Sequence, residues 1–242
     1  GWLRLPERQR SKAQAASFAA GEAVLLAALV SPLDPLGETL LSGHMVQHML
    51  LVAAAPPLLL LGRPGRAFAA AFPGGTLARA ARLRGIRPAL RGVSRLTGLL
   101  PATLLHALAL WGWHAPPAFE AALADDFLHG LEHASFFGTA LLFWFAALRA
   151  GRTARTALPG ALAAFATFLH GGLLGGLLSL APQPLYPAYG FRPALWGLTL
   201  VEDQQLAGLI MWVPIGPAYL ALTLWLVWSV DGGAETGQEI SR

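Results

Sequence analysis

Residues 42–62, "SGHMVQHMLLVAAAPPLLLLG", decide the fold, because a long apolar run here carries two histidines and two methionines. A helix that crosses a hydrocarbon core about 30 Å thick needs about 20 consecutive, mainly apolar residues. Histidine at membrane depth is costly unless its ring finds a partner, so it faces the interior of a bundle or a wet cavity. The stretch therefore predicts a transmembrane helix that carries a functional site.

Five further segments have a similar length and apolar character. Composition agrees, because 55% of the 242 residues are hydrophobic and only 12% are charged, against roughly 25% charged in soluble domains. We therefore predict an all-α, polytopic transmembrane bundle of six helices, a single integral membrane domain over residues 1–242. The predicted helices are 14–33, 39–61, 97–117, 128–148, 158–181 and 204–230.

The basic residues lie on one side of this predicted membrane. Of the 17 lysines and arginines, only Arg192 falls in a connection on the other side. The positive-inside rule assigns the basic side to the cytoplasm. Eight arginines lie in 62–96 among Ala, Leu and Phe, which predicts a basic cytoplasmic loop with an interfacial helix. The net charge of +4 thus indicates contact with a lipid bilayer and not with nucleic acid.

Five of the seven histidines are predicted at one depth, near the extracytoplasmic surface. His44 and His48 lie in the outer half of the second helix, His114 ends the third, and His129 and His133 begin the fourth. Both pairs have i, i+4 spacing, so each pair projects from one face of its helix. Three helices thus bring five imidazoles to one side of the membrane, and we predict a metal-binding histidine cluster there.

Copper is the predicted metal, with zinc as the alternative. Imidazole suits zinc, copper, nickel and iron, and thioether sulfur adds a preference for Cu(I). The chain has no cysteine, and its three methionines all fall near the histidine layer. Nearby carboxylates, Glu132 among them, would orient the rings. The predicted metal site comprises His44, His48, His114, His129, His133, Met45, Met49, Met211 and Asp203.

Two prolines predict an irregularity in the second helix. Pro56 and Pro57 cannot donate backbone hydrogen bonds, so the carbonyls of Val52 and Ala53 are released and the helix should bend there. Such kinks open room for a cavity inside a bundle.

The outward segment 181–197, "APQPLYPAYGFRPALWG", is rich in proline and aromatic residues. Amphipathic rings are favoured at the level of the lipid headgroups. We therefore expect Tyr186, Tyr189, Phe191 and Trp196 to form a lid at that level.

Two other functions stay open. "HGLEH", residues 129–133, has the H-x-x-E-H pattern of zinc proteases, in which Glu132 would activate water. A metal or proton transporter would need a polar path that continues inward, and His106 and His170 could extend one. The inner halves of the helices are otherwise apolar, so we interpret these two histidines as hydrogen-bonded packing residues.

At these residues the sequence resembles the CtaG-type assembly proteins of bacterial caa-type cytochrome c oxidase. The likeness runs from about Leu29 to Leu226, over "SGHMVQHMLLVAAAPPLLLLGRP", "HALALWGWHAPP", "LHGLEHASFFGTALLFW", "PLYPAYG" and "EDQQLAGLIMWVPIGPAYL". The resemblance implies a multi-pass protein of the bacterial plasma membrane that is needed for maturation of a copper-containing oxidase. It implies copper handling rather than catalysis, with oxidase subunits or a soluble copper donor as partners.

The resemblance also marks individual positions. Carried over by motif, these are the five histidines named above together with Asp203, Gln204 and Gln205. Members of this family have seven helices, whereas six are predicted here. We therefore expect a first family helix to precede Gly1.

Overall fold

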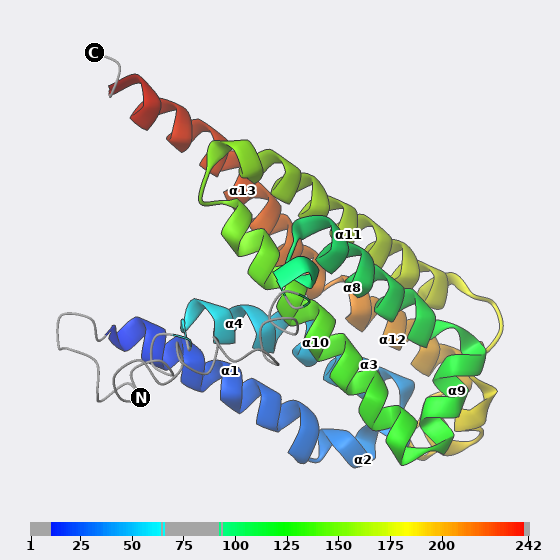
Figure 1. Cartoon of the computed structure of the whole chain (residues 1–242). Helices are drawn as coiled ribbons and strands as arrows, with labels where there is room; N and C mark the ends of the chain where they lie inside the picture. The colour runs from blue at the N-terminus through cyan, green and yellow to red at the C-terminus, as the bar shows by residue number, and fades with distance from the viewer. Residues whose placement is uncertain (1–10, 64, 66–91, 93, 240–242) are drawn as a thin grey trace.

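The computed structural model is a bundle of helices and describes residues 11–63, 65, 92 and 94–239. Within these ranges there is no β-strand, as the predicted all-α fold requires. Figure 1 shows α2 and α9 at one end of the bundle and the C-terminal part of α13 at the other. The basic loop with an interfacial helix that was predicted for 62–96 lies largely outside the described residues.

Ten α-helices and three shorter helical turns are found in the described ranges. The α-helices are α1 (Lys12–Val30), α2 (Leu33–Gly37), α3 (Leu41–Met49), α4 (Ala55–Leu61), α8 (Leu99–His114), α9 (Pro116–Ala124), α10 (Asp126–Ala150), α11 (Ala154–Leu180), α12 (Leu200–Trp212) and α13 (Ile215–Glu239). The π-helical turn η3 (Leu50–Ala54) joins α3 to α4, and the 3₁₀ turns η4 (Pro187–Tyr189) and η5 (Arg192–Trp196) lie between α11 and α12.

Five helical segments of the described chain are long and apolar enough to cross a membrane. They are Lys12–Val30, Leu41–Leu61, Asp126–Ala150, Ala154–Leu180 and Leu200–Val230. Each overlaps one of the predicted spans, and together they fit a multi-pass membrane protein.

The third predicted span, 97–117, forms a helix that is shorter than expected. α8 has 16 residues, which at 1.5 Å per residue cover about 24 Å. The cause is local, because Ala115 precedes Pro116 and has an extended backbone with ψ of 128°. A residue before proline is pushed out of the helical region, so α8 stops at His114 and α9 begins with the proline.

The second predicted span is interrupted where its two prolines were expected to disturb it. The π-helical turn η3 ends at Ala54, and Pro56 and Pro57 lie in the first turn of the following helix, α4. Pro56 has no N–H to donate to the Val52 carbonyl. This carbonyl instead accepts a hydrogen bond of 3.0 Å from the Trp144 indole of α10. The freed backbone oxygen thus fastens this span to the centre of the bundle.

α10 carries the two chemically distinct ends of the molecule. His129 lies in its first turn and Arg149 in its last. Arg149 lines a cleft of about 590 Å³ together with Arg63 and Arg152, at the end remote from the histidines. The basic and histidine-bearing ends are therefore separated along α10, as the charge pattern predicts.

Candidate metal centre

The five histidine rings meet at one end of the bundle. Within α3, the His44 and His48 ring centroids lie 4.2 Å apart, and within α10 those of His129 and His133 lie 4.3 Å apart. Across the helices the separations are 5.1 Å for His44 to His129, 5.3 Å for His48 to His133 and 5.7 Å for His48 to His114. The convergence predicted from the spacing is present, while metal binding itself stays a prediction.

Glu132 places a carboxylate inside this cluster. Its oxygens lie 3.5 Å from His44 Nε2 and 3.7 Å from His48 Nε2, and the side chain is fully buried. One ligand atom from each of His44, His129, Glu132 and His133 lies within 4.8 Å of the other three. Donors around one tetrahedral ion lie about 3.3 Å apart when metal–nitrogen bonds are about 2.0 Å. Small side-chain shifts would therefore let these four residues hold one ion.

Most polar side-chain atoms of the cluster have no hydrogen-bond partner among the described residues. Both ring nitrogens of His44 and His48 and both Glu132 oxygens are buried without a hydrogen-bond partner there. The Nε2 atoms of His114, His129 and His133 are likewise buried without a hydrogen-bond partner among the described residues. An unsatisfied buried polar group costs about 1–3 kcal/mol. The presence of several such groups in one place indicates a site that a bound ion would stabilise.

His114 is held in the tautomer that suits a ligand. Its Nδ1 lies 2.7 Å from the Leu110 carbonyl oxygen. Because a carbonyl only accepts, Nδ1 carries the proton and Nε2 keeps its lone pair. Metal-binding histidines commonly donate their second ring N–H in this way.

Asp203 holds the start of α3 and does not itself lie in the four-residue group. Its carboxylate accepts hydrogen bonds from Leu41 N (2.7 Å), Ser42 N (3.1 Å) and Ser42 Oγ (2.5 Å). The two N–H groups are backbone donors that a helix start leaves unsatisfied, and the third donor is the Ser42 hydroxyl. Asp203 was predicted as a metal-site residue, which stays a prediction, and its hydrogen bonds position the helix that carries His44 and His48.

Asp203→Ala is expected to destabilise the protein by about 3 kcal/mol, because each buried donor left without an acceptor costs roughly 1–3 kcal/mol. Copper affinity should fall as well, since His44 lies on the first turn of α3. Denaturant unfolding in detergent would measure the first effect. Asp125→Ala is the matched control, because Asp125 caps α10 in an exposed position and its loss should cost only about 1 kcal/mol. Equal losses in both variants would contradict the assigned role.

The segment between α11 and α12 covers the cluster. The Tyr186 hydroxyl donates to the His114 carbonyl (2.8 Å) and the Tyr189 hydroxyl to the Gly37 carbonyl (3.0 Å). Burial raises the pKa of both tyrosines, so both hydroxyls stay protonated donors. The Tyr186 ring packs on Phe119 at 4.3 Å, and Phe119 in turn lies 5.1 Å from the His44 ring.

The expected headgroup-level lid does not hold for two of its four rings. Tyr186 and Tyr189 are fully buried, whereas Phe191 and Trp196 are exposed and their position at the headgroup level stays a prediction. The difference arises because each tyrosine hydroxyl finds a buried carbonyl partner, which a membrane-surface position would not offer.

An open cleft leads to the cluster from this end of the bundle. It has a volume of about 360 Å³, and His44 and His129 lie in its wall. The other lining residues are Gly37, Glu38, Thr39, Ala122, Leu123, Asp126 and Arg192. The carboxylates of Glu38 and Asp126 would attract a cation to this opening.

Comparison with known proteins decides the family. The model of the cytochrome c oxidase caa3 assembly factor family (Caa3_CtaG) matches residues 1–230. The chain belongs to this family. No curated protein and no solved structure matches it. The chain is therefore a member of a family of cytochrome c oxidase assembly factors. The structure of this Caa3_CtaG member shows the histidine cluster in addition.

The two glutamines marked by the resemblance, Gln204 and Gln205, differ from each other in burial in this Caa3_CtaG member. Gln204 is buried, accepts a hydrogen bond from Leu185 N (2.6 Å) and donates to the carbonyls of Leu178 and Gln183 (both 3.3 Å). It therefore ties the covering segment to α12. Gln205 is exposed.

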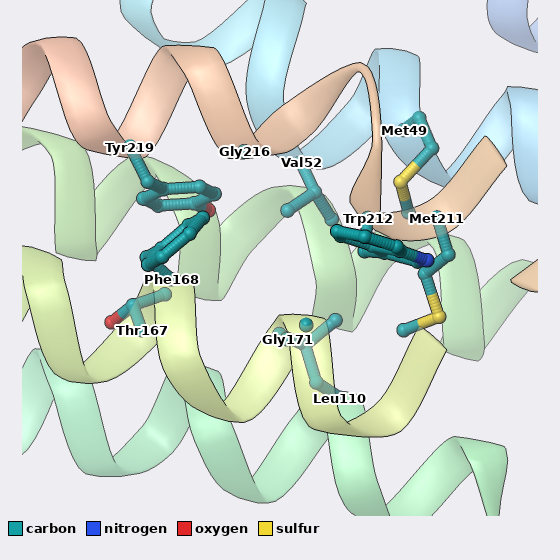
Figure 2. Close-up of a pocket in the computed structure, with 11 residues that line it drawn as sticks. Met49, Val52, Leu110, Thr167, Phe168, Gly171, Met211, Trp212, Gly216 and Tyr219 are labelled. Atoms are coloured by element: carbon teal, nitrogen blue, oxygen red, sulfur yellow. The ribbon is translucent and has the colours of Figure 1, made fainter. Parts of the chain in front are cut away.

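The predicted sulfur ligands lie in the hydrophobic core of the Caa3_CtaG bundle. Met45, Met49 and Met211 are all buried there. Met49 and Met211 line a cavity of about 20 Å³, beside Val52 and Leu110 (Figure 2). None of the five clustered histidines lines this cavity. A role for these methionines as copper ligands stays a prediction.

The two remaining histidines differ from each other. His106 Nδ1 lies 3.2 Å from the Thr139 hydroxyl and its Nε2 lies 3.2 Å from the Tyr219 hydroxyl. His106 is therefore a hydrogen-bonded packing residue, as predicted. Both ring nitrogens of His170 are buried without a hydrogen-bond partner in the described part of the chain, so the hydrogen bond expected for His170 is not found there.

Proposed function

We propose that this assembly factor binds copper through its histidine cluster and aids delivery of the metal to cytochrome c oxidase. The observation that carries the proposal is the group formed by His44, His129, Glu132 and His133, whose ligand atoms lie within 4.8 Å of one another. An oxidase of this kind contains copper, so a factor that assembles it has a reason to hold that metal. The partners are oxidase subunits or a soluble copper donor.

Copper fits the donor set better than other metals. The chain has no cysteine, and imidazole binds Cu(II) most tightly among the common divalent ions by the Irving–Williams order. Zinc is the alternative, because the same nitrogen and oxygen donors suit it. The positive-inside rule puts the arginine-lined end in the cytoplasm. The cluster and its acidic cleft then face the extracytoplasmic side of the bacterial plasma membrane.

We infer a role in metal transfer and not in catalysis. In the protease pattern the glutamate activates a water while two histidines hold the metal. Here the Glu132 carboxylate lies beside His44 and His48 as one more donor, an arrangement that suits a ligand. If the chain were a zinc hydrolase, Glu132→Gln would abolish its activity with metal still bound; survival of oxidase maturation in that variant would exclude this alternative.

The transporter alternative gains little support. It needs a polar path from the cluster inward, and His106 is already engaged by Thr139 and Tyr219. Copper uptake into proteoliposomes would distinguish the two functions, because a delivery factor is expected to give none.

The direct test compares the copper content and affinity of the purified protein with those of His48→Ala and His133→Ala. In each variant the copper site that loses its histidine is expected to bind about 100-fold more weakly, because even residues that only orient metal ligands change affinity by 10–100-fold. His170→Ala is the control and should bind as the parent does. Unchanged copper affinity in both cluster variants would contradict the assignment of these histidines as metal ligands.

A further inference from the structure

The histidine cluster offers more ligands than one copper ion uses. Each of its side chains has at least one buried nitrogen or oxygen without a hydrogen-bond partner among the described residues, and these side chains are His44, His48, His114, His129, Glu132 and His133. An ion bound by imidazole and carboxylate takes about four such donors. A single ion would leave at least two of these side chains buried and unsatisfied, which native proteins avoid.

The Glu132 carboxylate divides the cluster in two. One oxygen faces His44 Nε2 at 3.5 Å, and the other faces His48 Nε2 at 3.7 Å. Both distances exceed a hydrogen bond but lie close to the separation of about 2.8–3.4 Å between neighbouring donors on one ion. Each oxygen is therefore placed to share an ion with a different histidine.

The remaining histidines differ in whether they belong to the metal-binding group, although the His48 ring also lies 5.3 Å from the His133 ring. His129 and His133 belong to the group of His44 and Glu132, whereas His48 and His114 lie outside it. The His48 and His114 ring centroids are 5.7 Å apart, close to the roughly 5 Å expected for two imidazoles on one ion. The hydrogen bond to the Leu110 carbonyl fixes the tautomer of His114, which leaves a free lone pair on its Nε2.

We propose that the cluster binds two copper ions bridged by the Glu132 carboxylate. His44, His129 and His133 hold the first ion, and His48 and His114 hold the second. The inference rests on the proposed function, since it assumes that the cluster binds copper. Carboxylate-bridged pairs of metal ions commonly lie about 3.5–4 Å apart, and the negative charge between the ions reduces their mutual repulsion.

The two sites also differ in access. The first includes His44 and His129, which line the open cleft. The second is formed by His48 and His114, which are both buried and absent from the cleft wall. Copper is therefore expected to enter and leave through the first site, with the inner ion exchanging more slowly.

The test loads the purified protein with Cu(II), removes excess metal on a desalting column and measures copper per chain. The parent is expected to hold two ions, and the double variant His48→Ala/His114→Ala one. His170→Ala is the control and should hold two. Electron paramagnetic resonance gives an independent readout, because two bridged Cu(II) ions couple magnetically and lose most of the signal of isolated ions. The double variant should recover that signal at one spin per chain.

The outcomes separate this inference from the proposed function. One ion in the parent, unchanged in the double variant, would overturn the second site and leave copper binding intact. Two ions without magnetic coupling would also overturn it, because the second ion would then lie elsewhere. No tightly held copper in the parent would overturn both proposals together.

Discussion

Cells whose only copy of this protein carries His44→Ala together with His129→Ala are expected to lose most of their copper-dependent cytochrome c oxidase activity. These two histidines are the members of the cluster that line the open cleft. Removing both takes away two of the four donors of the metal group, and with them the part of the site that a donor protein or free ion reaches first. Affinity losses for single ligands multiply, so retention of copper at cellular concentrations is not expected.

Oxidase activity per haem in isolated membranes measures this effect. Immunoblots establish that the variant accumulates to the parental level, which separates a loss of function from a loss of protein. His170→Ala serves as the control, since His170 lies outside the cluster, and should sustain normal activity. Added copper should restore part of the activity of the double variant by mass action. Full oxidase activity in the double variant at parental protein level would refute the role of the cleft histidines.

Glu132→Leu is expected to stabilise the metal-free protein and to abolish its stabilisation by copper. The Glu132 carboxylate is buried with no hydrogen-bond partner among the described residues. An apolar side chain of similar size removes the cost of burying an unsatisfied carboxylate, which is about 1–3 kcal/mol of the free energy of unfolding. Functional sites are commonly built at the expense of stability. A gain in stability with a loss of copper binding is therefore the signature of a residue kept for its ligand role.

His106→Leu is the matched control for this experiment. His106 is equally buried but both of its nitrogens have hydroxyl partners, so its replacement should destabilise the protein and leave copper binding unchanged. Thermal unfolding in detergent, with and without copper, measures both variants. If Glu132→Leu proved as destabilising as His106→Leu, Glu132 would be a structural residue and its assignment as a ligand would fail.

The fold was predictable to the extent that its signals are local. Runs of about 20 apolar residues located the membrane-spanning helices, and Pro56 and Pro57 located the interruption at η3. The i, i+4 spacing placed His44 with His48 and His129 with His133. The C-terminal end of α8 lies three residues before the predicted one, because the effect of Pro116 on the preceding backbone was not applied there.

The missed features depend on contacts between distant parts of the chain. Asp203 accepts hydrogen bonds from Leu41 across a sequence separation of 162 residues, and an aspartate at the start of α12 has no local signal for that. The inward turn of Tyr189 toward Gly37 is another such contact. Glu132 was expected to orient the rings, and only the tertiary structure brings its carboxylate within reach of two helices' histidines.

X-ray absorption spectroscopy at the copper edge of the copper-loaded protein tests the central claim most directly. The account predicts nitrogen and oxygen ligands at about 2.0 Å, with the outer-shell scattering that imidazole rings produce, reduced in His48→Ala and in His133→Ala. A ligand shell without imidazole scattering, or one that neither substitution changes, would contradict the claim that histidines from separate helices share a metal site.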